Sequence, residues 1–355
     1  MKIYYYHTRP IREALQEWRE FKHPGHILYG LTHFEKYGIE SILHPYKYFS
    51  SRFKMMLYNL WQILFCKERY DVLYGTSFRG LELIIFLRAF GFYRKPIVIW
   101  HHTAVVSSPN KLKNEISRFF YRGIDQMFLF SERLIEDSLQ TGKVAAEKMQ
   151  LIHWGADLDF YNHLLETEQL QPSSRFISTG KENRDFQTLL SAFSKTDARL
   201  SVFTPPVMGN LNQEAIFQKY ASKGSNIQVN YVGGIIPHQL AKEVAQSSAV
   251  VISCLKFPYT VGLTTLVEAF ALGLPVITTD NPWFNMHVEE EGAGLCVDYS
   301  DEDGWIKAIH RIQNNPEMAR TMGHQGKKLA ENTYNLDNFT REMSETILRR
   351  FSLKK

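Results

Sequence analysis

One run of the chain combines residue types that suit binding of a diphosphate and a vicinal diol. Gly262-Leu263-Thr264 precedes an apolar helical pattern, and Glu268 falls on the second turn of that pattern. A glycine lets a ligand approach the backbone closely, and the first N–H groups of a helix carry partial positive charge. A carboxylate on the second turn can accept two hydrogen bonds from ribose hydroxyls. The run therefore predicts a nucleotide site, although a glycine, an amphipathic helix and a strand also make an ordinary α/β unit.

A second group of residues, Gly180-Lys181 with Arg184, follows a short strand and precedes another helical pattern. Cations and helix N–H groups that converge on one point suit a diphosphate. A basic loop alone is often solvated surface. Two anion-binding features in one half of the chain make the functional interpretation the better one.

A third group, His101-His102, directly follows the apolar strand expected over 96–100. Ligands of parallel sheets bind beyond the carboxyl ends of strands, so either histidine is a candidate catalytic residue. A hydrogen-bonded structural pair is the alternative.

The elements that would position these residues alternate between strand and helix along the whole chain. Helices are expected over 10–21, 27–37, 186–193 and 263–272, and a polar linker over 162–175. Short apolar strands are expected throughout, among them 2–6, 71–74, 126–130, 175–179, 249–254 and 275–279. This alternation predicts parallel sheets with right-handed crossovers. A chain of 355 residues is long enough for two such domains.

The run from Tyr259 to Asp280 resembles the donor-binding segment of retaining glycosyltransferases of family 4, which have the GT-B architecture. The matching residues are Gly262, Glu268, Ala269, Gly273, Pro275 and Val276. Thr260 stands where the family has an acidic residue. The resemblance is specific over about 175–300 and loose over 1–150.

The resemblance implies a set of functional residues. Those that would bind the donor are Gly180, Lys181, Arg184, Ile235, Thr260, Gly262, Leu263, Thr264 and Glu268. Those that would take part in catalysis are His101, His102, Lys181, Arg184 and Glu268. It also implies two Rossmann-like parallel-sheet domains that face a cleft, 1–165 and 166–335, with a C-terminal helix (336–355) crossing back to the first.

The activity implied is that of a retaining hexosyltransferase without metal or cofactor. It would move a sugar from a nucleotide-diphosphate sugar, UDP in preference to GDP, to a hydroxyl of a lipid-linked or polysaccharide acceptor of the cell envelope. The acidic runs 157–159 and 301–303 look superficially like metal-binding motifs, but helix capping suits them better. A nucleotide-sugar epimerase and a non-catalytic nucleotide-sugar-binding subunit are the alternatives, and Thr260 makes the second of these conceivable.

The cysteine content and the charge of the chain indicate its compartment and its possible partners. Three widely spaced cysteines favour a reducing compartment. We expect no signal peptide and no membrane-spanning segment, hence a cytoplasmic protein. Residues 1–150 carry 22 Lys and Arg against 14 Asp and Glu, a net charge of +8, and the remainder 19 against 23, a net charge of −4. No nucleic-acid-binding module is recognised.

The stretch 47–69 alternates basic residues with large apolar ones. An amphipathic helix of this composition suits an anionic membrane surface, which would make the protein peripheral at the inner face of the membrane. A helix that packs on the sheet and has solvated ends is the alternative.

Overall fold

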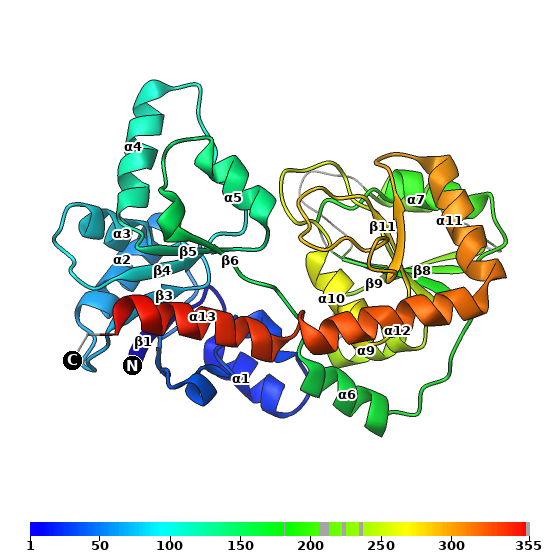
Figure 1. The fold of residues 1–355 in the computed structure, drawn as a ribbon, viewed down its shortest axis with the longest axis horizontal. Helices are drawn as coiled ribbons and strands as arrows, with labels where there is room; N and C mark the ends of the chain where they lie inside the picture. The colour runs from blue at the N-terminus through cyan, green and yellow to red at the C-terminus, as the bar shows by residue number, and fades with distance from the viewer. Residues whose placement is uncertain (181, 206–212, 222–224, 234–236, 353–355) are drawn as a thin grey trace. The chain divides into compact units, whose positions relative to one another are not determined.

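The computed structural model describes residues 1–180, 182–205, 213–221, 225–233 and 237–352, and the chain divides into two compact units (Figure 1). Unit 1 consists of Met1–Glu20, Gly25–His153 and Leu336–Lys355. Unit 2 consists of Phe21–Pro24 and Trp154–Asn335. Each unit contains a six-stranded parallel sheet with helices on it, which confirms the α/β fold with two Rossmann-like domains.

The sheet of unit 1 has the strand order β2-β1-β3-β4-β5-β6, and every neighbouring pair is parallel. Its strands are β1 (Lys2–Tyr6), β2 (Glu40–Leu43), β3 (Val72–Gly75), β4 (Ile97–Trp100), β5 (Gln126–Leu129) and β6 (Met149–Leu151). The central strands β3, β4 and β5 are buried along their whole length, as expected where helices cover both faces of a parallel sheet.

The helices of unit 1 lie on both faces of this sheet (Figure 1). One face carries α2 (Arg52–Leu64), α3 (Glu82–Ala89), α4 (Lys111–Arg122) and α5 (Glu132–Leu139). The other face carries α1 (Ile11–Arg19) and the C-terminal helix α13 (Leu336–Phe351). Met343 of α13 lies against strand residues there, since its sulfur accepts a hydrogen bond from Trp100 Nε1 at 3.1 Å.

The helix predicted over 27–37 is wrong. Two 3₁₀ segments replace it, η1 (Gly25–Leu28) and η2 (Phe34–Tyr37). Tyr29 (φ 48°) and Gly30 (φ 90°) between them have left-handed backbone conformations, which a right-handed helix cannot accommodate. A third 3₁₀ segment, η3 (Ala146–Lys148), precedes β6.

The sheet of unit 2 has the order β12-β11-β10-β7-β8-β9 and is also parallel. Its strands are β7 (Phe176–Thr179), β8 (Leu200–Thr204), β9 (Ile227–Tyr231), β10 (Ala249–Ile252), β11 (Val276–Thr279) and β12 (Gly294–Val297). Its helices are α6 (Leu158–Thr167), α7 (Phe186–Ser194), α8 (Glu214–Tyr220), α9 (Pro237–Ala245), α10 (Leu263–Ala271), α11 (Glu302–Asn314) and α12 (Pro316–Asn332).

Helix α6 changes the expected organisation between the domains. It occupies the first part of the linker predicted over 162–175, and it packs on α9 and α10. Helix α6 belongs to the continuous stretch Trp154–Asn335 of unit 2.

No helix among the residues described combines the length and the apolar character needed to cross a membrane.

Candidate functional site

The loop after β7 places a buried arginine at the carboxyl edge of the sheet of unit 2. Arg184 is only 6% exposed, its Nε donates to the Thr179 carbonyl at 3.3 Å, and its Nη2 donates to Thr265 Oγ1 at 3.1 Å. Gly180 makes room for this side chain. It has φ 133°, and a Cβ there would lie 2.4 Å from Arg184 Nη2.

A short antiparallel bridge holds this loop in place. Arg184 pairs with Cys254, just beyond β10, and the Leu255 N–H donates to the Asn183 carbonyl at 2.8 Å. Asn183 has φ 52°, a conformation that non-glycine residues seldom adopt. Backbone hydrogen bonds therefore join the segments just before α7 and just after β10.

The guanidinium of Arg184 has no carboxylate partner among the described residues. The adjacent acid, Asp185, caps α7 instead and accepts hydrogen bonds from the Thr188 N–H at 3.1 Å and the Thr188 hydroxyl at 2.7 Å. Burying a charge without a counter-ion is unfavourable by several kcal/mol. This edge of the sheet is therefore suited to an anion.

The amino end of α10 lies at the same edge, because Thr265 in its first turn bonds Arg184. Gly262 is the N-cap with φ 93°, and a Cβ there would lie 2.5 Å from the Ile252 side chain. The Leu263 N–H donates to the Thr260 carbonyl at 3.2 Å. In the part of the chain that the structure describes, no acceptor pairs with the N–H groups of Thr264 and Thr265. They add the positive end of a helix dipole to the charge of Arg184.

Glu268 is half-buried on the second turn of α10. Tyr161 of α6, which is 2% exposed, lies beside it. Burial, together with the neighbouring Glu268 carboxylate, raises the pKa of Tyr161 well above its ordinary value. The phenol therefore stays protonated, so it can stabilise the charge of Glu268 while the second carboxylate oxygen serves a ligand.

The carboxyl end of α10 is fixed by a cation. Lys327 Nζ of α12 donates to the Ala271 carbonyl and to Asn162 Oδ1, both at 2.7 Å. An ammonium group at this end of a helix interacts favourably with its dipole. The helix that presents Glu268 is thus held at both ends.

Thr260, in the place of the family's acidic residue, is buried in the turn before α10. Asn281, just beyond β11, fixes that turn by donating to the carbonyls of Tyr259 and Val261, each at 3.3 Å. The buried thiol of Cys254 also donates to the Val261 carbonyl, at 3.3 Å, and burial raises its pKa.

Lys181 and Ile235, two of the predicted donor-binding residues, lie outside the described residues. The other predicted residues of this half come together: Gly180, Arg184, Thr260, Gly262, Leu263, Thr264 and Glu268 gather at the carboxyl ends of β7 and β10 or on the helix that follows β10.

The two histidines after β4 of unit 1 have different surroundings. His101 is buried, with Nδ1 hydrogen-bonded to the Thr103 carbonyl and Nε2 to the Tyr121 hydroxyl at 3.0 Å. The Nε2 of His102 hydrogen-bonds with the Tyr29 hydroxyl at 3.0 Å, and its ring stacks on Phe130. Burial and the neighbouring His101 lower the pKa of His102 to about 4, so its ring is neutral at pH 7.

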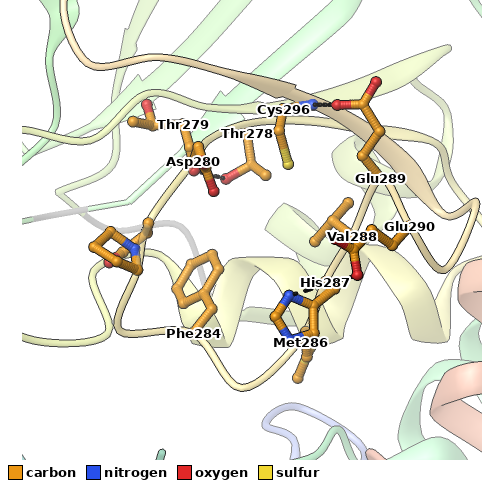
Figure 2. A pocket seen from close by; sticks show the side chains of 12 residues that line it. Thr278, Thr279, Asp280, Phe284, Met286, His287, Val288, Glu289, Glu290 and Cys296 are labelled. Carbon is orange, nitrogen blue, oxygen red and sulfur yellow. Dashed lines mark hydrogen bonds and ion pairs between the residues drawn. The ribbon is translucent and has the colours of Figure 1, made fainter. Parts of the chain in front are cut away.

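A cavity of about 420 Å³ opens beside the candidate donor site, at the carboxyl ends of β11 and β12 (Figure 2). Its polar lining includes Asp280, His287, Glu289 and Glu290, and its apolar lining includes Phe284, Met286 and Val288. Asn281 lines this cavity, and its amide also donates to the Val261 carbonyl in the turn before α10.

Within the described stretches no group of three or more His, Cys, Asp or Glu side chains is arranged to hold a metal ion. The two acidic runs cap helices, as expected. Asp157 accepts a hydrogen bond from the Phe160 N–H at 3.2 Å, and Asp301 accepts one from the Gly304 N–H at 2.9 Å.

Sequence reasoning missed three residues of this site. Thr265 was visible as a polar residue in an apolar helix pattern, and Asn281 as an amide directly after a buried strand. Tyr161 carried no signal, because its relation to Glu268 depends on how α6 packs on α10.

Two Rossmann-like parallel-sheet units, the second with a buried arginine beside the amino end of a helix, make up the fold of the GT-B class of glycosyltransferases. Residues 171–329 match the family described as glycosyl transferases group 1, which identifies this part of the chain as a glycosyltransferase domain. No curated protein matches the sequence.

Solved structures of the same fold cover nearly all of the chain. The chain is similar to Anabaena Alr3699/HepE in complex with UDP-glucose, with a TM-score of 0.69 and 13% identity over 98% of this chain and 100% of that one. It is similar to a glycosyltransferase from Rickettsia africae, with a TM-score of 0.68 and 16% identity over 98% and 99%. Sucrose-phosphate synthase from Thermosynechococcus elongatus has a TM-score of 0.66 and 18% identity over 88% and 83%.

Proposed function

We propose that the chain is a retaining glycosyltransferase of family 4 type, which moves a sugar from a nucleoside-diphosphate sugar to a hydroxyl of a lipid-linked or polysaccharide acceptor. The observation that carries the proposal is the buried guanidinium of Arg184. It meets the amino end of α10 and has no carboxylate partner among the residues described.

The proposed chemistry is stabilisation of a leaving group. Cleavage of the bond between the anomeric carbon and the diphosphate oxygen leaves its electron pair, and so additional negative charge, on the diphosphate. Arg184 and the N–H groups of Thr264 and Thr265 are preorganised donors for that charge. Lys181 remains a proposed second cation.

Glu268 is proposed to bind the ribose diol of the donor. Its place on the second turn, beside a phenol that stays protonated, supports this role. Thr260 can bond a sugar hydroxyl but adds no charge, so the sugar preference would differ from that of a protein with an acid there.

UDP is proposed as the leaving nucleotide, because the similar HepE structure contains UDP-glucose. His101 and His102 are proposed catalytic residues, and the neutral ring of His102 can exchange hydrogen bonds with hydroxyls. The protein is proposed to act in the cytoplasm, without metal, and to contact an anionic membrane surface through 47–69.

Nucleotide binding is tested by thermal unfolding with UDP, GDP and ADP. A ligand at 100 times its Kd stabilises the folded state by about 2.7 kcal/mol. We expect a shift with UDP that is absent in the Arg184→Met variant. A wild-type chain that no nucleotide stabilises would contradict the proposal.

Turnover is tested with UDP-sugars and hydroxyl acceptors. We expect sugar transfer, with KM for the donor raised at least tenfold in Glu268→Ala, because hydrogen bonds to a charged group contribute about 1.5–3 kcal/mol. Conversion of the donor without acceptor would instead show an epimerase. Nucleotide binding without turnover across a broad panel of acceptors would show a binding subunit.

A further inference from the structure

Helix α2 has an apolar face that points to solvent. Phe53, Leu57, Trp61 and Leu64 recur at intervals of four, four and three residues, and their exposed fractions lie between 46% and 61%. The Phe65 ring, also 61% exposed, lies 4.1 Å from the Trp61 ring, centroid to centroid. These five residues form what we call the α2 stripe.

The stripe is not needed to hold α2 on the sheet. The opposite face of the helix packs inward through Ile63 and Asn59. The Asn59 amide donates to the Gly80 carbonyl and to the Tyr6 hydroxyl, each at 3.0 Å. Helix α2 therefore packs on the sheet and still presents an apolar face outward, and its contact with a membrane stays a prediction.

A second apolar cluster lies on α3 and α4. Phe90 and Phe92, just after α3, are 63% and 79% exposed, and Leu112 and Ile116 of α4 are 69% and 50% exposed. The Phe119 ring, one turn beyond Ile116, lies 4.6 Å from the Phe90 ring. We call these five residues the α4 cluster.

Both sets belong to one layer of helices. Helices α2, α3 and α4 lie on the same face of the sheet, where α3 packs against α2 on one side and against α4 on the other (Figure 1). Each of these helices follows a strand of a parallel sheet and runs antiparallel to it. The carboxyl ends of α2 and α3 therefore both lie at the amino edge of that sheet. Trp61 and Phe65 of the stripe, and Phe90 and Phe92 of the cluster, therefore share one edge of the layer.

The charge around these residues is positive. Residues 45–67 contain four cations, Lys47, Arg52, Lys54 and Lys67, and no acid. Helix α4 contains four cations and one acid. Arg52 and Arg118 are paired with Glu82 and Glu115, which leaves the lysines to meet an external anion.

We propose that the α2 stripe and the α4 cluster together form a docking surface for an anionic lipid bilayer. Apolar and aromatic side chains on one helix layer enter the interface between headgroups and acyl chains, while flanking lysines meet lipid phosphates. The surface extends the proposed membrane contact from 47–69 to α3 and α4. It rests on unit 1 alone and does not depend on the donor site.

Lipid binding is measured by co-sedimentation of the full chain with vesicles of phosphatidylcholine, alone or with about a third phosphatidylglycerol. The first variant combines Phe53→Ser with Trp61→Ser, and the second combines Phe90→Ser with Phe92→Ser. The matched control is Tyr231→Ser, an aromatic residue of unit 2 that is 49% exposed. Thermal stabilisation by UDP is recorded for each variant.

We expect the wild-type chain and the control to bind the anionic vesicles, and each double variant to bind at least about tenfold more weakly. Vesicle binding by the double variants equal to that of the wild type would overturn the proposal. A wild-type chain that does not bind anionic vesicles would also overturn the proposal. If that chain instead forms dimers, and Trp61→Ser dissociates them, the apolar surface is a contact between two copies of the chain. An unchanged response to UDP in the double variants shows that any loss concerns docking and not the donor site.

Discussion

Arg184 offers a direct test of whether the site in unit 2 is built for an anion. A structural arginine stabilises the folded chain, so its removal is destabilising. Removal of an arginine that serves to bind a ligand is expected to stabilise the folded chain, because the buried charge is unfavourable until the ligand binds. Substitution by Met retains an unbranched apolar side chain and removes the charge.

The magnitude follows from the contacts. Arg184→Met removes the hydrogen bonds to the Thr179 carbonyl and the Thr265 hydroxyl, which together contribute about 1–3 kcal/mol. It also removes a buried cation that has no carboxylate partner among the described residues, an effect of several kcal/mol in the opposite direction. Without ligand, we expect the free energy of unfolding of Arg184→Met to exceed the wild-type value by no more than about 2 kcal/mol.

The assay is urea unfolding with and without UDP. The control is Arg175→Met in the same unit, because Arg175 is paired with Glu243 and lies at the other end of β7. We expect the control to lose up to about 1 kcal/mol and to keep its full response to UDP. The reasoning is refuted if Arg184→Met loses 3 kcal/mol or more, as for a broken buried pair, and UDP still stabilises it.

Three further predictions concern other residues. Gly180→Ala adds strain of about 1–3 kcal/mol and displaces the Arg184 side chain, so we expect KM for the donor to rise about tenfold. The control is Gly292→Ala, where φ is 69° and the added Cβ has no neighbour within 4 Å. This substitution is also strained, but we expect it to leave KM unchanged. Tyr161→Phe removes the phenol beside the site's carboxylate, so we expect a severalfold higher KM for UDP-sugar, measured by steady-state kinetics, but no such increase for a 2′,3′-dideoxy donor. His7 and His44 are buried, and burial lowers the pKa of each to about 4. Because an unfolded histidine has a pKa of about 6.5, the stability they contribute is complete above pH 6.5 and is lost as the pH falls towards 4. Urea unfolding at pH 5 should show a loss of roughly 2 kcal/mol for each, and His44→Gln should reduce that loss.

Local pattern was sufficient to predict the donor half of the fold. Helix α10 and strand β11 lie within a residue of their expected bounds, because apolar periodicity, Gly262 and Gly273 all favour the same structure. The prediction over 27–37 failed because Tyr29 adopts a left-handed conformation, which nothing in a single sequence reveals. The polar stretch 162–175 looked like a linker, yet Asp157 caps a helix that continues through Thr167.

Only those residues of the candidate site that follow a strand or lie near the start of a helix could be predicted from the sequence. Arg184 and Glu268 were found in this way. The burial of Arg184 and its lack of a carboxylate partner among the described residues depend on how two loops pair, and the position of Tyr161 depends on how α6 packs. The outward apolar face of α2 was equally hidden, because periodicity alone does not say whether a stripe faces the sheet or solvent.

Salt should separate the two kinds of electrostatic interaction proposed for this chain. The lysines around the α2 stripe are exposed, and exposed charges are screened over a distance that falls from about 10 Å at 0.1 M salt to about 3 Å at 1 M. The guanidinium of Arg184 is buried, so its interaction with a diphosphate is screened much less. Residues 154–335, which make up most of unit 2, carry 14 Lys and Arg against 20 Asp and Glu, a net charge of −6, so long-range attraction does not draw the donor to unit 2. Raising salt across this range should therefore weaken vesicle binding far more than stabilisation by UDP. Equal losses would mean that the donor site also acts through exposed charge.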